Sequence, residues 1–261
     1  MAERRRGTMM YRERLELTDR VAVVTGGSRG IGLAVVTALV EFGARVVIAD
    51  VLDEAGVEAA SSFPDGRASY VHLDVTDPAA VEATFADVAR RLGSVDVLVT
   101  SAGIANHQPS LELERETWDR VLAVNATGTF WCAREAARHM GERGGSIVAI
   151  GSMSGELANA PQRQAAYNAS KGAVHLAVKS LAIEFAEQNI RVNAVAPGYV
   201  GTDLTKQGVP DEWWDDWVRR TPMGRLGAPE EIGSLVAFLA SDAASYMTGS
   251  VVLIDGGYAA W

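Results

Sequence analysis

The sequence contains a single cysteine, Cys132, among its 261 residues. One thiol cannot form a disulfide within the chain or supply a cysteine-rich zinc site, and it favours a reducing, cytoplasmic location. No apolar run approaches the ~20 residues that a membrane-spanning helix needs, so no membrane partner is expected. The 4 histidines show no spacing typical of metal ligands, so no metal site is expected either.

Positive charge is also scarce, because 24 Lys and Arg stand against 33 Asp and Glu, a net charge of −9. Binding to nucleic acid needs a basic face, so nucleic acid is not an expected partner. The length allows one large domain or at most two small ones. Residues 1–14 are polar and basic and lack the apolar core of a secretory signal. We expect them to be a disordered extension, followed by one domain over residues 15–261.

Short strand-like runs alternate with helical patterns along the rest of the chain. The expected strands are Val21–Thr25, Arg45–Asp50, Ser69–Leu73, Val95–Thr100, Ser146–Ile150, Arg191–Val195 and Val251–Ile254. The expected helices include Ile31–Phe42, Pro78–Leu92, Glu116–Met140, Ala165–Gln188 and Glu230–Ala240. Because most of the strand runs are apolar on consecutive positions, they favour a parallel sheet buried on both faces. The pattern predicts an α/β, doubly wound domain with seven parallel strands and about six helices.

A glycine-rich segment, Thr25–Gly32, follows the first expected strand and opens the first expected helix. Glycine lets the backbone turn tightly or approach a phosphate closely, and a helix N-terminus attracts a pyrophosphate. The spacing is G-x-x-x-G-x-G, which differs from the common dinucleotide fingerprint, and an ordinary glycine-rich turn is the alternative. The candidate binding residues are Gly26, Ser28, Arg29, Gly30, Ile31 and Gly32.

Asp50 ends the second expected strand, 24 residues after Gly26. A carboxylate at that place can accept hydrogen bonds from an adenosine ribose and would repel a 2′-phosphate. It therefore favours NAD(H) over NADP(H), although Arg29 could pair with such a phosphate. Asp74 and Val75, after the third expected strand, are candidates for contact with the adenine, and helix capping is the alternative for Asp74.

Tyr167 and Lys171 are spaced i, i+4, so they share one face of an expected helix. A lysine cation one turn away stabilises a phenolate, which lowers the pKa of the tyrosine toward that of a general base. Ser152 closes the fifth expected strand at the sheet edge where ligands bind in such folds. Asn125 interrupts a helical pattern with a poor helix former, which indicates either a function or a local bend.

Together these motifs resemble the short-chain dehydrogenase/reductase family, over Leu17–Trp261. The resemblance implies a Rossmann-type domain, NAD(P)(H) as cofactor and a homotetramer. It implies that Tyr167 is the acid/base, Ser152 polarises the substrate oxygen and Lys171 tunes Tyr167 and binds ribose. Asn125 would hold a water molecule in a proton relay.

One motif departs from the family pattern, because Thr100-Ser101-Ala102-Gly103 stands where Asn-Asn-Ala-Gly is usual. Contacts made by the two amide side chains are lost, whereas backbone contacts can survive. The resemblance completes the set of cofactor-binding residues with Ser101, Ala102, Gly103, Tyr167, Lys171, Pro197, Gly198, Val200 and Thr202.

Within the family the chain looks most like polyol dehydrogenases of the galactitol, sorbitol and arabinitol kind and related secondary-carbonyl reductases. The segments that carry this likeness are Gly151–Gly155, Ala196–Val200, Thr221–Arg225 and Asp255–Tyr258. The expected substrate contacts are Ser152, Ser154, Asn159, Tyr167 and Trp214, and turn chemistry is the alternative for Ser154 and Asn159. Residues 199–224 are expected to form a lid, with Trp213 and Trp217 one helical turn apart. Ordinary packing or a subunit contact is the alternative for this tryptophan cluster.

These observations predict an NAD-dependent oxidoreductase that interconverts a secondary alcohol, either a polyol or a vicinal diol, and its ketone. The alternative within the same class is a 3-oxoacyl or other carbonyl reductase that uses NADPH. The alternative from another class is a nucleotide-sensing protein without catalysis, against which the complete set Asn125, Ser152, Tyr167 and Lys171 argues.

Overall fold

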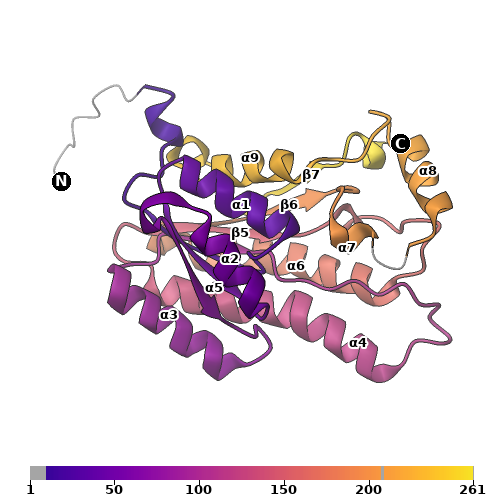
Figure 1. Ribbon diagram of the computed structural model, residues 1–261, viewed down its shortest axis with the longest axis horizontal. Coiled ribbons are helices and arrows are strands. Elements are labelled where there is room, and N and C mark those ends of the chain that lie inside the picture. The colour runs from indigo at the N-terminus through magenta and orange to yellow at the C-terminus, as the bar shows by residue number, and fades with distance from the viewer. Residues whose placement is uncertain (1–9, 207–208, 261) are drawn as a thin grey trace.

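One sheet of seven parallel strands runs through the computed structural model, which describes residues 10–206 and 209–260. The strands are β1 (Val21–Thr25), β2 (Arg45–Asp50), β3 (Ala68–His72), β4 (Val97–Thr100), β5 (Gly145–Ile150), β6 (Ile190–Pro197) and β7 (Val251–Ile254). They lie in the order β3-β2-β1-β4-β5-β6-β7 (Figure 1). The order reverses between β1 and β4, so the carboxyl ends of these two strands flank the crevice where doubly wound sheets bind ligands.

Helices cover both faces of the sheet. They are α1 (Gly30–Glu41), α2 (Asp53–Ser61), α3 (Pro78–Leu92), α4 (Arg115–Leu122), α5 (Thr129–His139), α6 (Ala165–Glu184), α7 (Asp203–Lys206), α8 (Asp211–Arg220) and α9 (Pro229–Ala240). In Figure 1, α1 and α9 lie above the sheet, and α3, α4 and α6 lie below it. Alternate residues of β1 enter opposite layers: Val21 and Val23 pack with α3, α5 and α6, whereas Ala22 and Val24 pack with α1 and α9.

The expected sheet is confirmed, with seven parallel strands near the expected positions. β4 begins two residues later than expected, at Val97, and β6 extends to Pro197. The expected helix Glu116–Met140 is divided, because a π-helical segment, Ala123–Gly128, separates α4 from α5. The short helix α2 was not expected, since its Ala- and Glu-rich sequence has little apolar periodicity.

Part of the expected N-terminal extension, residues 1–14, lies against the domain. Residues 1–9 lie outside the described residues. Met10–Arg14, in contrast, are placed against the domain: Glu13–Leu15 form a 3₁₀ turn, and Arg14 donates to the Asp242 carbonyl at 3.0 Å and to Ser245 Oγ at 3.1 Å. The prediction of disorder was therefore wrong for these last residues, because their contacts with a distant part of the chain have no local signature.

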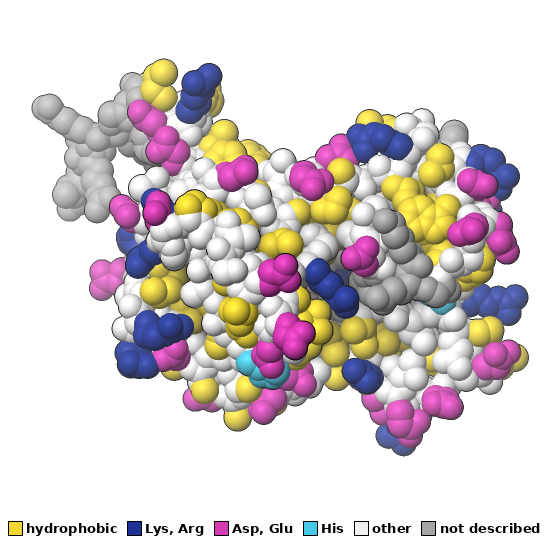
Figure 2. Space-filling view, viewed as in Figure 1, with side chains coloured by type: hydrophobic (Ala, Val, Ile, Leu, Met, Phe, Trp, Pro, Cys, Tyr) yellow, Lys and Arg dark blue, Asp and Glu magenta, His cyan; other side chains and the backbone are white. Residues whose placement is uncertain are grey.

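The single cysteine lies in the interior on α5, and its side chain is fully buried. Burial raises the pKa of the Cys132 thiol to about 12. Over residues 10–206 and 209–260, we find no helix with both the length and the apolar character needed to cross a bilayer. Acidic and basic side chains are intermixed on the face that Figure 2 shows.

Candidate active site

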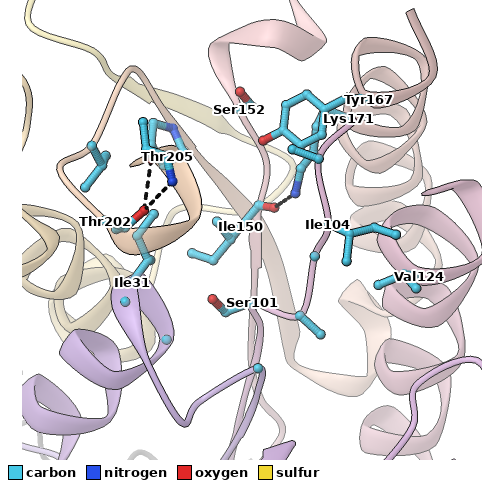
Figure 3. A pocket seen from close by; sticks show the side chains of 18 of the residues that line it. Ile31, Ser101, Ile104, Val124, Ile150, Ser152, Tyr167, Lys171, Thr202 and Thr205 are labelled. Carbon is cyan, nitrogen blue, oxygen red and sulfur yellow. Dashed lines mark hydrogen bonds between the residues drawn. The ribbon is translucent and has the colours of Figure 1, made fainter. Parts of the chain in front are cut away.

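A cavity of about 590 Å³ opens at the carboxyl edge of the sheet, where β1, β4, β5 and β6 end (Figure 3). All the predicted site residues line it except Ser28, Asn125 and Trp214. The cavity is continuous from Asp50 and Asp74 to Ser154 and Asn159. One elongated space therefore joins the predicted cofactor residues to the predicted substrate residues.

The glycine-rich segment packs against the loop after β4. Gly26 has φ +65°, and a Cβ atom built there would lie 2.6 Å from Ala102 Cα and from Ala102 N. A Cβ atom on Gly32 would lie 2.0 Å from the Gly26 carbonyl oxygen. These positions need glycine for close backbone approach, while Gly30, at φ +56°, turns the chain into α1. Within the described residues the N-cap residue Arg29 makes no side-chain cap hydrogen bond to α1, so the N–H groups of the helix suit the pyrophosphate of a dinucleotide.

Asp50 is nearly buried, and both of its carboxylate oxygens accept backbone hydrogen bonds. Ser28 N donates to Oδ2 at 3.1 Å, and Leu52 N donates to Oδ1 at 3.2 Å. Ser28 thus lies behind the cavity wall and orients Asp50. Its buried hydroxyl has no partner within the described part of the chain. Arg29 is exposed and also lines the cavity.

Asp74 and Val75 follow β3. Asp74 Oδ1 accepts from Thr76 N at 2.9 Å and from Thr76 Oγ1 at 2.7 Å, and these bonds lower the pKa of Asp74. Asp74 does not cap α3, because Asp77 accepts from the N–H groups of Ala79 and Ala80. The capping alternative for Asp74 is thereby excluded, and its carboxylate remains on the cavity wall.

Tyr167 and Lys171 lie on one face of α6, and both side chains point into the cavity (Figure 3). Lys171 Nζ lies 5.6 Å from the centre of the Tyr167 ring and donates to the Ile150 carbonyl at 2.8 Å. Burial lowers the pKa of Lys171 to about 8. Burial also raises the pKa of Tyr167, and a hydrogen bond with Ser152 opposes this rise. The net shift of the Tyr167 pKa is therefore upward, opposite to the lowering expected from Lys171.

Ser152 directly follows Gly151 at the end of β5, and its hydroxyl lies beside the phenol of Tyr167 (Figure 3). Its Oγ accepts from the backbone N–H of Ser154 at 3.1 Å, so the residue caps the short turn Met153–Gly155. This contact leaves the hydroxyl proton available for donation to Tyr167 or to an oxygen of a ligand in the cavity.

Asn125 lies outside the cavity wall, fully buried in the π-helical segment. Its Nδ2 donates to the Ile104 carbonyl at 2.9 Å and to Ser170 Oγ at 3.0 Å, and its Oδ1 accepts from Ile104 N at 2.9 Å. The amide thus ties the loop after β4 to α6. The π-helical segment is the local irregularity that the sequence offers as the alternative to a function at Asn125, and the function stays a prediction.

Several wall residues are not among the predicted cofactor and substrate contacts. Gln162 Nε2 donates to Tyr199 Oη at 2.7 Å, and Trp217 Nε1 donates to Gln162 Oε1 at 3.1 Å. The Tyr199 ring stacks on Trp217, with centroids 4.2 Å apart. Gln164 Nε2 donates to Ser154 Oγ at 3.2 Å and to Asn159 Oδ1 at 3.1 Å. Because these residues come from α8 and from the two loops after β5 and β6, no local spacing in the sequence indicates them.

The predicted contact at Trp214 is not supported by this geometry. Trp217 lines the cavity and is 2% exposed, whereas Trp214 only packs beside it, with ring centroids 5.8 Å apart. The helix was expected, but which tryptophan faces inward depends on how α8 is rotated against Tyr199. His107 also lines the cavity and meets Trp213 edge to face at 5.7 Å.

Pro197 ends β6, and the segment after it closes one side of the cavity. A Cβ atom on Gly198 would lie 2.8 Å from Asp255 Cα, so this position needs glycine. Val200 forms a parallel bridge with Gly227, and Thr202 Oγ1 lies 2.9 Å from Thr205 Oγ1 (Figure 3).

Comparison with known proteins agrees with this geometry. Residues 26–259 match the family model described as enoyl-(acyl carrier protein) reductase. The chain is 45% identical to galactitol 2-dehydrogenase (L-tagatose-forming) of Cereibacter sphaeroides, over 97% of this chain and 100% of the relative. A short-chain type dehydrogenase/reductase from Mycobacterium marinum superposes with a TM-score of 0.92 at 38% identity, covering 96% of this chain and 99% of that one.

A second solved structure is a gluconate 5-dehydrogenase from Burkholderia cenocepacia J2315 in complex with NADP and tartrate. Its TM-score is 0.91 at 35% identity, covering 97% of this chain and 100% of that chain. Fold, cavity and full-length similarity agree: the chain belongs to the short-chain dehydrogenase/reductase family, nicotinamide-dependent oxidoreductases that act on CH–OH groups.

Proposed function

We propose that this protein oxidises one secondary alcohol of a polyol or vicinal diol to the ketone, with NAD as the hydride acceptor. The observation that carries the proposal is the composition of the cavity wall beside Tyr167. Ser154, Asn159, Gln162 and Gln164 all lie there, so hydroxyl and amide groups surround the expected substrate. These groups also bond to one another and to Tyr199 and Trp217. A substrate with several hydroxyl groups can exchange hydrogen bonds with such a wall, whereas an acyl chain can form none with it.

Aromatic side chains close the same end of the cavity. Tyr199 and Trp217 stack on each other, and Gln162 bonds to both of them. We propose that they belong to a lid over residues 199–224, of which residues 207–208 lie outside the described residues. A sugar-like substrate offers C–H faces to such rings and hydroxyl groups to the amides. The 45% identity with galactitol 2-dehydrogenase supports this substrate class.

A nicotinamide cofactor, held by the glycine-rich segment and Asp50, would supply the hydride acceptor for the carbinol carbon in the proposed reaction. Tyr167 takes the hydroxyl proton, so the alcohol loses a hydride and a proton and becomes a ketone. Ser152 Oγ–H donates to the substrate oxygen and fixes it beside Tyr167. The buried ammonium group of Lys171 lies one turn away and stabilises the negative charge that Tyr167 carries before it takes the proton.

We propose that Asn125 serves the proton relay from behind the cavity wall. Its side-chain amide bonds to Ile104 and Ser170, and its backbone carbonyl oxygen accepts from Thr129 Oγ1 at 2.8 Å. The π-helical turn brings this residue near Lys171, since a Cβ atom on Gly103 would touch both side chains. A water molecule held in this region would link Lys171 to solvent.

The preference for NAD over NADP rests on Asp50. Its carboxylate is held by two backbone N–H groups, and it lies on the cavity wall at the end of β2. A 2′-phosphate there would meet a fixed negative charge. Arg29 is the residue that favours NADP, because its side chain could pair with the 2′-phosphate. The gluconate 5-dehydrogenase structure with NADP shows that this fold can bind that cofactor. A carbonyl reductase that uses NADPH is therefore the second candidate.

The experiment that tests the proposal measures initial rates at 340 nm with NAD and NADP. Hexitols, pentitols, vicinal diols and 3-oxoacyl esters form the substrate panel. We expect NAD-linked oxidation of a polyol, and a loss of about 10²–10⁴-fold in kcat in Tyr167→Phe with unchanged far-UV circular dichroism. A preference for NADPH with an oxoacyl ester would overturn both the substrate class and the cofactor.

We further propose that the protein is a homotetramer. Leu176 and Ile183 are 67% and 80% exposed on the outer face of α6, and Phe130 is 38% exposed on neighbouring α5. Large apolar side chains at such exposure favour a protein contact. Light scattering coupled to gel filtration measures the mass of the assembly.

A cytoplasmic location is the last part of the proposal. The only cysteine is a free, buried thiol, and a reducing compartment would keep it so. Fractionation of the source cells, with detection by an antibody to the chain, tests the location.

A further inference from the structure

Two side chains of α6 hold the carboxyl end of β5. Lys171 Nζ donates to the Ile150 carbonyl at 2.8 Å. One helical turn further on, His175 Nε2 accepts from the backbone N–H of Ser152 at 3.4 Å. His175 is 4% exposed, and nothing in the proposed proton transfer uses it. Its hydrogen bond to the site is the one from Ser152 N–H.

Two glycines make room for the imidazole. A Cβ atom on Gly151 would lie 2.4 Å from His175 Nε2, and one on Gly155 would lie 2.6 Å from His175 Cε1. Neither glycine has a positive φ, so the backbone conformation does not require glycine at these places. The segment Gly151–Gly155, which carries Ser152, packs directly on the ring.

The hydrogen bonds determine the tautomer of His175. Nε2 accepts from Ser152 N–H, so this nitrogen carries no proton. In the neutral ring the proton is then on Nδ1, which lies 3.1 Å from Glu156 Oε1 and donates to it. A chain of two hydrogen bonds thus runs from Ser152 through the imidazole to Glu156.

We propose that neutral His175 is a positioning residue that holds Ser152 against the substrate oxygen, and that its protonation releases Ser152 and slows the reaction. A protonated ring has an N–H at both nitrogens and cannot accept from Ser152. Two donors would then face each other, and the turn that carries Ser152 would have to move. This inference rests on the proposed role of Ser152.

Burial and the charged groups around His175 determine the pH range in which the imidazole becomes protonated. Burial lowers the pKa of His175 below its usual value near 6.5, and the ammonium groups of Lys171 and Lys179 act in the same direction. The Glu156 carboxylate opposes them. Because the pKa is lowered, Ser152 is held fully at neutral pH, and the hold is lost as the pH falls through the lowered pKa.

The test compares His175→Gln with His175→Leu. A glutamine amide oxygen can occupy the position of Nε2 and accept from Ser152, yet it does not titrate; leucine fills space without accepting. Ketone reduction is measured from pH 5 to 8, because reduction needs protonated Tyr167 and so does not lose rate to Tyr167 on the acid side. We expect His175→Leu to lower kcat about 10-fold or more, with the KM for the cofactor within about 2-fold.

The glutamine variant distinguishes the proposed role from a purely structural one, because only the proposed role predicts a change in the pH dependence of the rate. His175→Gln should keep kcat within about 3-fold of the parent and lose the acid-side inflection of the rate. Glu156→Gln should keep the inflection and shift it to lower pH, because the charge that favours protonation is gone. A His175→Leu variant with parental kcat and pH profile would overturn the inference, and so would an inflection that persists in His175→Gln.

A measurement without turnover covers the case in which His175→Leu does not fold. Long-range ¹H–¹⁵N correlation spectra distinguish imidazole tautomers, and the peak of His175 is the one missing in His175→Gln. We expect the Nδ1–H form at pH 7.5; the Nε2–H form would overturn the inference. Ser152→Ala separates the two proposals: parental kcat in that variant overturns the proposed function itself, whereas a large loss there beside unaffected His175 variants overturns only this inference.

Discussion

At the scale of single residues, Asp50 has two tasks that the sequence presents as one. Its place at the end of a strand predicts contact with a ribose. The structure adds that its two oxygens bond the backbone at Ser28 and Leu52, so the side chain also joins the glycine-rich segment to the loop after β2. A substitution must keep these bonds if it is to report on the cofactor alone.

Asp50→Asn is therefore the informative change. Its remaining carbonyl oxygen can keep one backbone bond, and the negative charge is lost. Two charges ~4 Å apart near a protein surface interact by about 4 kcal/mol, so we expect the NADP-to-NAD ratio of kcat/KM to rise at least about 10-fold. Steady-state kinetics with both cofactors checks this. An unchanged ratio would show that Asp50 does not discriminate between them.

The sequence could identify those site residues that are defined by their spacing on one helix or by their place at the end of a strand. Tyr167 and Lys171 are four residues apart on one helix, and Ser152 ends a strand, so their meeting follows from the fold. Gln162 and Tyr199 are far apart in the chain and meet only because the loops after β5 and β6 converge on α8. Their roles needed the structure.

At the scale of elements, the close approach of the glycine-rich segment to the loop after β4 can be tested with a matched pair. Gly26 and Gly66 have nearly the same φ, +65° and +63°, but a Cβ atom on Gly66 meets nothing within 4 Å. Gly66→Ala should cost about 1–2 kcal/mol from its φ alone.

Gly26→Ala should cost at least about 1–3 kcal/mol more, because its Cβ overlaps Ala102. It should also weaken NAD binding. Urea unfolding gives the stability difference, and fluorescence titration gives the affinity. Equal losses in the two variants would show that the contact with Ala102 carries no energy.

The rotation of α8 can be tested with its tryptophans. Trp217→Phe removes the donor to buried Gln162 Oε1, and an unpaired buried acceptor costs about 1–3 kcal/mol. It should also raise the KM for the polyol, because Gln162 and Tyr199 lose their support. Trp214→Phe is the control and should change stability by no more than about 0.5 kcal/mol. Thermal unfolding gives the change in stability of each variant, and steady-state kinetics gives its KM for the polyol. A larger rise in KM in Trp214→Phe than in Trp217→Phe would restore Trp214 as the substrate contact.

Elements with strong periodicity were predicted well, and elements without it were not. Consecutive β-branched residues in the sequence indicate the buried strands. α2 is rich in alanine and glutamate and was missed, and the π-helical turn at Asn125 was read as part of one helix. A π-helical segment within a helix needs no particular residue type. It changes only which side chains face the core, so the sequence pattern does not reveal it.

At the scale of the whole molecule, the exposed face of α6 predicts the state of assembly. Leu176 and Ile183 are seven residues apart, so they share one face of the helix. Leu176→Asp with Ile183→Asp should reduce the mass seen by light scattering to that of a smaller assembly. Val57→Asp on α2, where Val57 is 58% exposed, is the control and should leave the mass unchanged. A parental mass in the double variant would place the interface elsewhere.

The buried thiol of Cys132 has a practical consequence for studying motion in solution. With its pKa raised to about 12 and no exposed surface, it should not react with maleimides in the folded protein. One cysteine introduced on the exposed side of α8, at Asp215, would then carry a dye at a single known position. Emission changes on adding NAD and polyol would report directly on whether α8 moves during turnover.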